Sequence, residues 1–325
     1  MKSKIKPIFY IAVLLCVAAC NNTILEKFWD NPANTAEPTE LYVDGVLKMK
    51  ARLPAILAWI KSNTVDNTYY TIQVGTDDSL LPNEGLLLYP DKTGVTICLA
   101  GKNIERIITI TDNAAGSLFE VGKNITLVLK NITLKGHDKN NRALITVSSR
   151  GTLILKDGAI IRDNIVSAAV NSPGITGGGI KVEGILIMEG GQIMNNKSND
   201  EGGGIYVYPG TFRMNDGFIY GNEAGLAGGG VCVRGVFTMQ GGVISNNRVT
   251  GKYNGTWIIG GGGVCVYSGN LTKTGGIIGA NNVVERYYGG GDAVFAYHNS
   301  SAKVRNRTLG EYDTISTENW TIGWE

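Results

Sequence analysis

Short apolar triplets recur along the chain, and each of the clearest copies follows a run of glycines. In these triplets two apolar residues flank a central residue of variable polarity; the copies are Ile180-Lys181-Val182, Ile205-Tyr206-Val207, Val231-Cys232-Val233 and Val264-Cys265-Val266. Alternation with a period of two is typical of β-strands. We therefore expect the flanking residues to face a core and the central residue to face outward.

Each triplet opens a longer unit, which contains two further strand-like segments and ends at an asparagine. The apolar positions of the third segment are Ile160, Ile193, Ile219, Ile244 and Ile278, and the asparagines are Asn196, Asn222, Asn247 and Asn281. The glycine-preceded triplets begin 25, 26 and 33 residues apart. Weaker copies lie at 119–129 and 145–160, and a last copy is expected at 293–295, with Val294 pointing outward.

A unit of three short strands cannot enclose a core by itself, but stacked units can, with each strand paired to its equivalent in the next unit. Glycines suit the corners because they permit bends that side chains would block. We predict an all-β fold: a right-handed, single-stranded, pectate-lyase-like parallel β-helix of about seven to eight coils, with the hand taken from the rule for parallel crossovers. Propellers and leucine-rich repeats fit the spacing less well.

The segment before the coils has a different character. Residues 1–20 are typical of an export signal: a basic start, a short apolar run, and Val17-Ala18-Ala19-Cys20 at the end. Residues 21–42 are polar and indicate a flexible tether, whereas 43–75 predict an N-terminal cap. This cap is expected to contain a helix from Leu53, with Ile56, Leu57 and Ile60 on one face, and the first strand at 68–75. The β-helix domain then covers 76–325.

Three resemblances follow from these residues. The end of the signal resembles the bacterial lipobox, which implies cleavage before Cys20 and a lipid on its sulfur; the alternative is an ordinary secretory signal with a chance cysteine. The glycine triplet before Ile or Val, with Ile-x-x-Asn later in the unit, is similar to the GGAI and FxxN repeats of chlamydial polymorphic outer-membrane proteins. The whole layout resembles the β-helix lipoproteins of treponemes and other host-associated bacteria.

Composition adds little that is specific. The net charge is +2, which does not favour nucleic acid as a partner. Beyond Cys20, the mature chain holds Cys98, Cys232 and Cys265, and an odd number does not indicate a disulfide framework. We expect Cys232 and Cys265 to stack outward on neighbouring coils as free thiols. No cofactor is expected.

The outward positions show little sign of catalytic chemistry. In the first strand they are Thr146, Lys181, Tyr206, Cys232, Cys265 and Val294, and Glu120 lies one coil earlier. Asp157 and Asp216 share a turn position two coils apart, which suits either a pair of glycosidase carboxylates or two ordinary turn residues. The asparagine column is expected to form a structural ladder of side-chain hydrogen bonds.

Variation in coil length falls mainly after the asparagine, so the insertions should gather along one edge. Two of them carry basic and aromatic residues that could contact a sugar or a protein; these candidate binding residues are Lys252, Tyr253, Trp257, Arg286, Tyr287 and Tyr288. Alternatively, the insertions fold back over the strands and bury these side chains.

The sequence and its resemblances therefore predict a lipid-anchored protein of the cell envelope, in the outer membrane of a diderm bacterium, that binds a glycan or a host protein as an adhesin would. Its partners would be the membrane, through the lipid, and that ligand, with no nucleic acid. A polysaccharide-active lyase or glycosidase is the alternative. A structural envelope lipoprotein without a ligand is the third reading.

Overall fold

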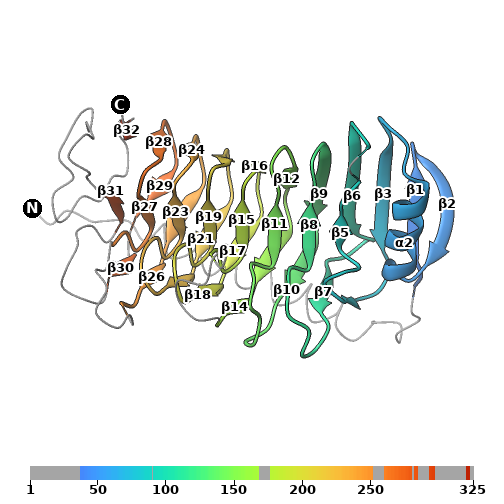
Figure 1. The fold of residues 1–325 in the computed structure, drawn as a ribbon, viewed down its shortest axis with the longest axis horizontal. Helices are drawn as coiled ribbons and strands as arrows, with labels where there is room; N and C mark the ends of the chain where they lie inside the picture. The colour runs from blue at the N-terminus through green and yellow to red at the C-terminus, as the bar shows by residue number, and fades with distance from the viewer. Residues whose placement is uncertain are drawn as a thin grey trace, which may run out of the picture. The chain divides into compact units, whose positions relative to one another are not determined.

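In a computed structural model of the chain, parallel β-sheets dominate the architecture (Figure 1). The structure describes residues 37–89, 91–167, 176–251, 260–279, 282–284, 293–296 and 320–322. The described helix and strands belong to the unit Pro38–Glu325. Within the described residues there is one helix, α2 (Leu53–Asn63), and the strands form four sheets, named sheets A to D below.

Sheets A and B have eleven and eight strands. In spatial order, sheet A contains β2 (Val46–Ala51), β1 (Thr39–Val43), β3 (Tyr69–Val74), β6 (Val95–Gly101), β9 (Ile125–Lys130), β12 (Thr152–Leu155), β16 (Ile185–Met188), β20 (Thr211–Met214), β24 (Val236–Met239), β28 (Asn270–Lys273) and β32 (Trp320–Ile322). Sheet B contains β4 (Asp78–Leu80), β7 (Arg106–Ile110), β10 (Ile132–Lys135), β13 (Ala159–Arg162), β17 (Gln192–Met194), β21 (Phe218–Tyr220), β25 (Val243–Ser245) and β29 (Ile277–Ile278).

Sheets C and D have eight and five strands. Sheet C contains β5 (Leu86–Leu87), β8 (Phe119–Val121), β11 (Ile145–Val147), β15 (Ile180–Val182), β19 (Ile205–Val207), β23 (Val231–Val233), β27 (Val264–Val266) and β31 (Val294–Ala296). Sheet D contains β14 (Ile165–Val166), β18 (Lys197–Ser198), β22 (Glu223–Ala224), β26 (Arg248–Val249) and β30 (Val283–Val284).

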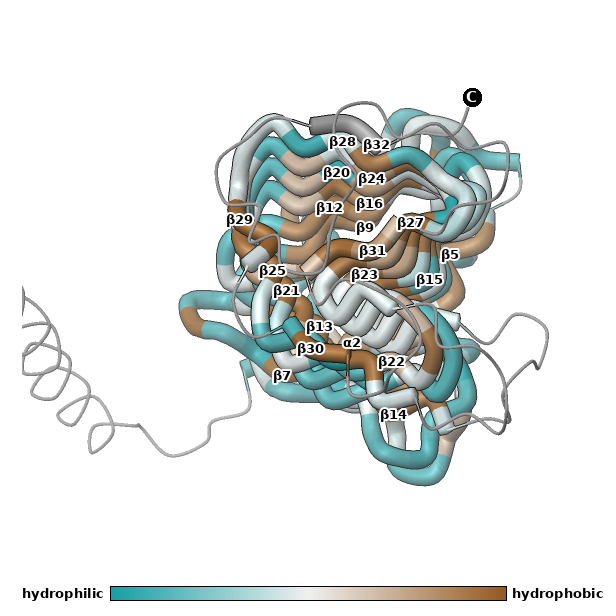
Figure 2. Tube along the Cα trace, turned by 90° about the vertical axis from the view of Figure 1, so that its left-hand side faces the viewer, coloured by the Kyte–Doolittle hydropathy of each residue, from teal (hydrophilic) through white to brown (hydrophobic). Residues whose placement is uncertain are grey.

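Equivalent strands of successive repeats pair in parallel and in register. Ile205, for example, pairs with Ile180 on one side and with Val231 on the other. Figure 2, turned by 90°, shows strands of one sheet lying behind one another, as in β28, β24 and β20. The antiparallel pairs among the described strands are β1–β2, β1–β3 and β28–β32. The all-β, parallel character predicted from the period-two pattern is therefore confirmed.

The flanking residues of the triplets are buried, and they form one continuous apolar cluster with the inward residues of sheets A and B. Phe212 and Phe237 stack in this cluster with their ring centroids 4.5 Å apart. Each such residue contributes roughly 1.5–3 kcal/mol when it is fully buried. The period-two alternation thus places an apolar ladder inside sheets A, B and C.

The glycine runs allow the backbones of neighbouring repeats to approach closely. Gly202 has a φ of +67°, a conformation that favours glycine. A side chain at Gly203 would lie 2.4 Å from the carbonyl oxygens of Glu223 and Gly229. The triplet is therefore needed both for the bend and for the contact with the next repeat.

Buried asparagines follow sheet B and form the predicted ladder, which is confirmed. Asn196 Nδ2 donates to Asn222 Oδ1 at 3.1 Å, and Asn222 Nδ2 donates to Asn247 Oδ1 at 3.0 Å. The next member is Asn282, which accepts from Asn247 at 3.1 Å, whereas Asn281 lies outside the described residues. The assignment of Asn281 to this column was wrong by one residue, because Ile278 is followed by Gly279 and an extra residue before the asparagine.

Two further assignments were also wrong by one residue. Ile161, not Ile160, pairs with Ile193 and faces the core, because the turn at Asp157–Gly158 is followed by one extra residue, Ala159. At the other end of the chain, Val294 pairs with the buried Val264, so Phe295 takes the outward position beside Cys265. A slip of one residue exchanges the two faces of a strand.

Sheet D was not predicted. Its strands are two residues long, and they occupy the starts of the segments that the sequence indicated as insertions. Two residues are too few to show a period. The segments that follow the asparagines therefore begin as paired strands.

The predicted helix is confirmed, with Leu53, Ile56, Leu57 and Ile60 buried. It lies against β2 at the N-terminal end of sheet A (Figure 1), and the Asp78 carboxylate accepts a hydrogen bond from the Leu53 amide at 3.2 Å.

The strand predicted at 68–75 is confirmed as β3, but it is not the first strand, because the hairpin of β1 and β2 precedes it. An Asp44-Gly45 turn connects the two strands of this hairpin, and both turn residues have positive φ. The tether predicted for 21–42 overlaps β1 at its last residues.

Candidate functional site

The residues predicted to bind a ligand or a lipid lie outside the described residues. They are Cys20, Lys252, Tyr253, Trp257, Arg286, Tyr287 and Tyr288. Among the described residues, the candidate site lies instead on the outer face of sheet C, in its N-terminal half.

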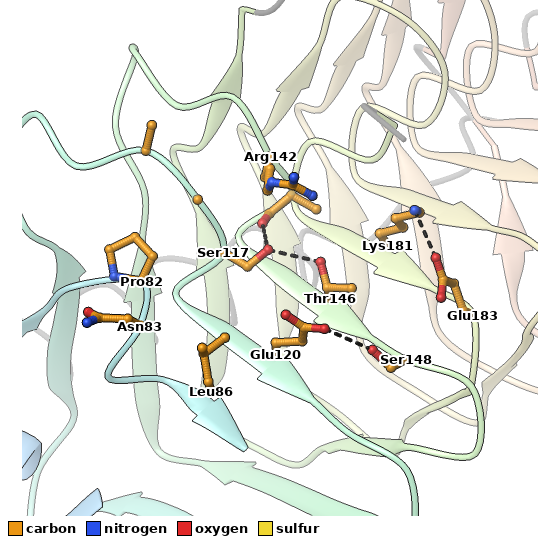
Figure 3. A pocket seen from close by; sticks show the side chains of 13 residues that line it. Pro82, Asn83, Leu86, Ser117, Glu120, Arg142, Thr146, Ser148, Lys181 and Glu183 are labelled. Carbon is orange, nitrogen blue, oxygen red and sulfur yellow. Dashed lines mark hydrogen bonds and ion pairs between the residues drawn. The ribbon is translucent and has the colours of Figure 1, made fainter. Parts of the chain in front are cut away.

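A cleft of about 460 Å³ lies on this face, across β5, β8, β11 and β15 (Figure 3). Glu120, Thr146 and Lys181 stand in one column of the floor, because their strands pair in register. Ser148 and Glu183 each follow their strand by one residue and line the same cleft. The wall is formed by the turn before β5 and the segments before β8 and β11, through Pro82, Asn83, Ser117 and Arg142.

Two pairs of polar side chains fix the floor. Ser117 donates its hydroxyl hydrogen to the carbonyl of Ala143 at 2.8 Å, and its Oγ lies 2.9 Å from Thr146 Oγ1. Since the hydroxyl hydrogen of Ser117 is used, Thr146 donates to Ser117 and keeps lone pairs for a ligand. Ser148 donates to Glu120 Oε1 at 3.2 Å, which leaves the carboxylate with further acceptor capacity.

Charged groups of both signs line the cleft. Lys181 and Glu183 form an ion pair at 2.9 Å, so they neutralise one another. Glu120 is bound by a hydroxyl, and the Arg142 side chain is exposed at the wall (Figure 3). The cleft can therefore donate and accept hydrogen bonds at fixed positions on a rigid sheet, as recognition of a polyhydroxylated ligand requires.

Further along sheet C the outer face is covered. Tyr206, Cys232 and Cys265 are buried there, and Leu226 and Ala227 from the segment after β22 pack against them. For this segment, the alternative in which insertions fold back over the strands is the one observed.

A carboxylate from the segment after β18 also contacts this face. Glu201 accepts from Arg234 Nε at 2.8 Å and from Nη2 at 2.6 Å, and the guanidinium lies 3.7 Å from the ring centre of Tyr267. Tyr208, whose ring centroid is 6.5 Å from that of Tyr206, remains 51% exposed.

The two stacked cysteines are in register, as predicted, and both are free thiols. They are fully buried, although their side chains point away from the core. Burial raises the pKa of the Cys232 thiol well above its ordinary value, and the hydrogen bond to Cys265 adds to this effect. The Cys232 thiol is therefore a poor nucleophile.

Asp157 and Asp216 behave as turn residues. Both are exposed, and Asp216 Oδ1 accepts a hydrogen bond from the Gly217 amide at 2.7 Å. A side chain at Gly190, the equivalent position between them, would lie 2.2 Å from Asp157 Oδ1. This geometry favours the turn interpretation over a catalytic pair.

Within the described residues, no three His, Cys, Asp or Glu side chains are grouped in a way that could hold a metal ion. The same part of the chain has no helix of the length and apolarity that crossing a bilayer requires.

Sequence reasoning found the floor of the cleft only in part. Glu120, Thr146 and Lys181 were recognised as outward residues, whereas Ser148 and Glu183 were missed because the alternation was not extended two residues beyond the central position. Ser117 and Arg142 precede their strands, and no local pattern marks them. Comparison with protein-family models, with curated proteins and with solved structures finds no match to this chain.

Proposed function

We propose that this protein is a lipid-anchored cell-envelope protein that binds a glycan in the cleft on sheet C. The observation that supports it is the cleft itself, in which Thr146 and Glu120 stand on paired strands and are held by hydrogen bonds with Ser117 and Ser148. Sugars present several hydroxyl groups at fixed spacing, and fixed donors and acceptors on a rigid sheet suit them.

The proposal includes the scaffold, a right-handed parallel β-helix of about seven to eight coils. Its support is that each repeat supplies one strand to each of sheets A, B and C, always in parallel register. The right hand is taken from the general rule for parallel crossovers. Such a stack would present the cleft without movement of its floor.

The proposal also includes the anchor at Cys20, in the outer membrane of a diderm bacterium, for which the lipobox-like sequence is the support. A role as an adhesin, and a contribution of the loop residues Lys252, Tyr253, Trp257, Arg286, Tyr287 and Tyr288, remain predictions. They would extend the binding surface beyond the cleft.

A glycan-array screen of the full-length protein in detergent micelles tests the function. A hit should be weakened about three- to tenfold by Thr146→Val and by Ser148→Ala, since a hydrogen bond contributes about 0.5–1.5 kcal/mol. Thr238→Val, on the outer face of sheet A, is the matched control. Glycan binding that is indifferent to both cleft variants would place the ligand elsewhere.

A polysaccharide-cleaving enzyme is the second candidate, because Glu120 and Glu183 share one cleft with a hydroxyl and a lysine. Release of shorter products from a bound polysaccharide, abolished by Glu120→Gln, would favour this candidate over a binding protein. Binding without product release would favour the first. A structural lipoprotein without a ligand is the reading left if no glycan binds.

A further inference from the structure

The charged side chains in the cleft differ in whether they have a partner of opposite charge. Lys181 and Glu183 are paired with each other at 2.9 Å. The guanidinium of Arg142, by contrast, has no ion-pair or hydrogen-bond partner among the described residues, and Figure 3 shows it beside the Ser117–Thr146 pair with no interaction drawn to it. Arg142 is therefore the cation of the cleft that is available to a ligand.

The main chain holds Arg142 firmly at this position. Its carbonyl oxygen accepts a hydrogen bond from Asn164 Nδ2 at 2.9 Å, and the next residue, Ala143, accepts from Ser117. Asn164 is fully buried and belongs to the asparagine ladder. The base of the arginine is thus fixed to the scaffold, although its side chain is exposed.

Arg142 and Glu120 lie on opposite sides of the Ser117–Thr146 pair in Figure 3. A ligand in this cleft would meet a guanidinium at one side, hydroxyl oxygens in the middle and a carboxylate at the other. A guanidinium binds a carboxylate through two parallel hydrogen bonds, and a carboxylate accepts hydrogen bonds from sugar hydroxyls. A neutral sugar would leave the guanidinium without a charged partner.

We propose that the cleft selects an acidic sugar, with the ligand carboxylate on Arg142 and its hydroxyls on Thr146 and Glu120. This inference rests on the proposed glycan-binding function and specifies its substrate class. Glu120 opposes a second negative charge, so it orients the sugar with the acid group toward Arg142.

The test uses full-length protein in detergent micelles and matched pairs of oligosaccharides: glucuronate against glucose oligomers, and galacturonate against galactose oligomers. By titration calorimetry, the wild type should bind one acidic oligomer at least about tenfold more tightly than its neutral counterpart at low salt. This preference should fall as salt is raised, because the contact is exposed.

Arg142→Gln should abolish the preference, because the carboxylate of the acidic oligomer then loses its charged partner. Arg142→Lys should keep part of it, since the charge remains and the two parallel hydrogen bonds do not. Arg213→Gln is the control, because Arg213 is an exposed arginine on the outer face of sheet A. Circular dichroism and melting curves establish that the variants fold.

Three results would overturn the inference. Equal affinity of the wild type for the acidic and the neutral member of each pair would overturn the acid preference but not the proposed glycan binding. A preference that survives Arg142→Gln would place the acid-binding group elsewhere. Failure of the wild type to bind any of these oligomers would overturn the inference together with the proposed function.

Discussion

The asparagine ladder gives the sharpest test of how the repeats are held together, and Asn222→Ala is the variant of choice. Asn222 is 1% exposed, and its side chain bonds to both neighbouring repeats. Its Oδ1 accepts from the Asn196 amide at 3.0 Å and from Asn196 Nδ2 at 3.1 Å. Its Nδ2 donates to Ile193, Tyr220 and Asn247 at 2.9, 3.1 and 3.0 Å.

Truncation to alanine removes these bonds and leaves the buried Asn196 amide without its acceptor. An unsatisfied buried donor costs about 1–3 kcal/mol, and each further bond lost costs about 0.5–1.5 kcal/mol. Since Asn196 Nδ2 keeps a bond to Ile161 and Asn247 Oδ1 keeps one from the Asn222 amide, we expect a total of about 4 kcal/mol. For a chain of this size, this is a fall of about 8 °C in the melting temperature.

The assay is thermal and urea unfolding followed by circular dichroism. Asn215→Ala, an exposed asparagine in the turn after β20, is the matched control and should change stability by less than about 0.5 kcal/mol. Asn222→Asp should be worse than alanine at neutral pH, because its carboxylate would face the oxygens of Ile193, Tyr220 and Asn247. The stability of Asn222→Asp should recover partly in acid, where its carboxylate becomes protonated. Equal stability of Asn222→Ala and Asn215→Ala would refute the reasoning.

Three further predictions concern other parts of the chain. Lys273→Met should raise stability by about 1–3 kcal/mol, because it extends the buried column of Met188, Met214 and Met239 and removes an ammonium with no partner among the described residues. Burial lowers the pKa of Lys273 in the folded protein. The wild type should therefore gain stability as pH rises toward 10.5, whereas the variant should not. Melting temperatures of the two proteins that change in parallel from about pH 8 to 10.5 would contradict this prediction. The Lys50 and Tyr42 hydrogen bonds lower the pKa of Glu40 from 4.5 to about 2, so its contribution should be present above pH 4.5 and lost as pH falls toward 2. Glu40→Gln should flatten this acid limb of the melting temperature, and an unchanged limb would mean that Glu40 is not responsible. Cys20→Ser should leave a precursor that partitions into the aqueous phase of a detergent separation, and partitioning equal to that of the wild type would exclude the lipid anchor.

Much of the fold could be predicted because side-chain alternation and glycine placement are local properties. The three residues from Ile205 to Val207 are enough to show which face of the strand is apolar. Eight residues are enough to show the apolar face of the helix at Leu53–Asn63. The ladder of asparagines was predictable because one residue type returns at one point of every repeat. These features need no knowledge of distant contacts.

The errors have an equally local cause. Two arose where a segment contains one more residue than its equivalents, at Ala159 and before Asn282, and the third where Asp292 and Ala293 replace the last glycines before Val294. A sequence read in isolation shows no partner strand to set the register. The strands of sheet D are too short to show any period. The cleft was found only in part, because Arg142 and Ser117 lie in segments that precede their strands. Their positions depend on how those strands pair, which no local sequence pattern shows.

The in-register pairing of whole repeats has a consequence for how such a gene can change. The segment 205–230 is one complete repeat, and its loss would join Gly204 to Val231 in the same way that Gly230 precedes Val231 now. Ile180 would then meet Val231, Ile193 would meet Ile244, and Asn196 would meet Asn247, each a like-for-like contact. Unequal recombination between repeats can therefore shorten or lengthen the protein while every apolar face keeps its match, whereas a deletion of a fraction of a repeat cannot.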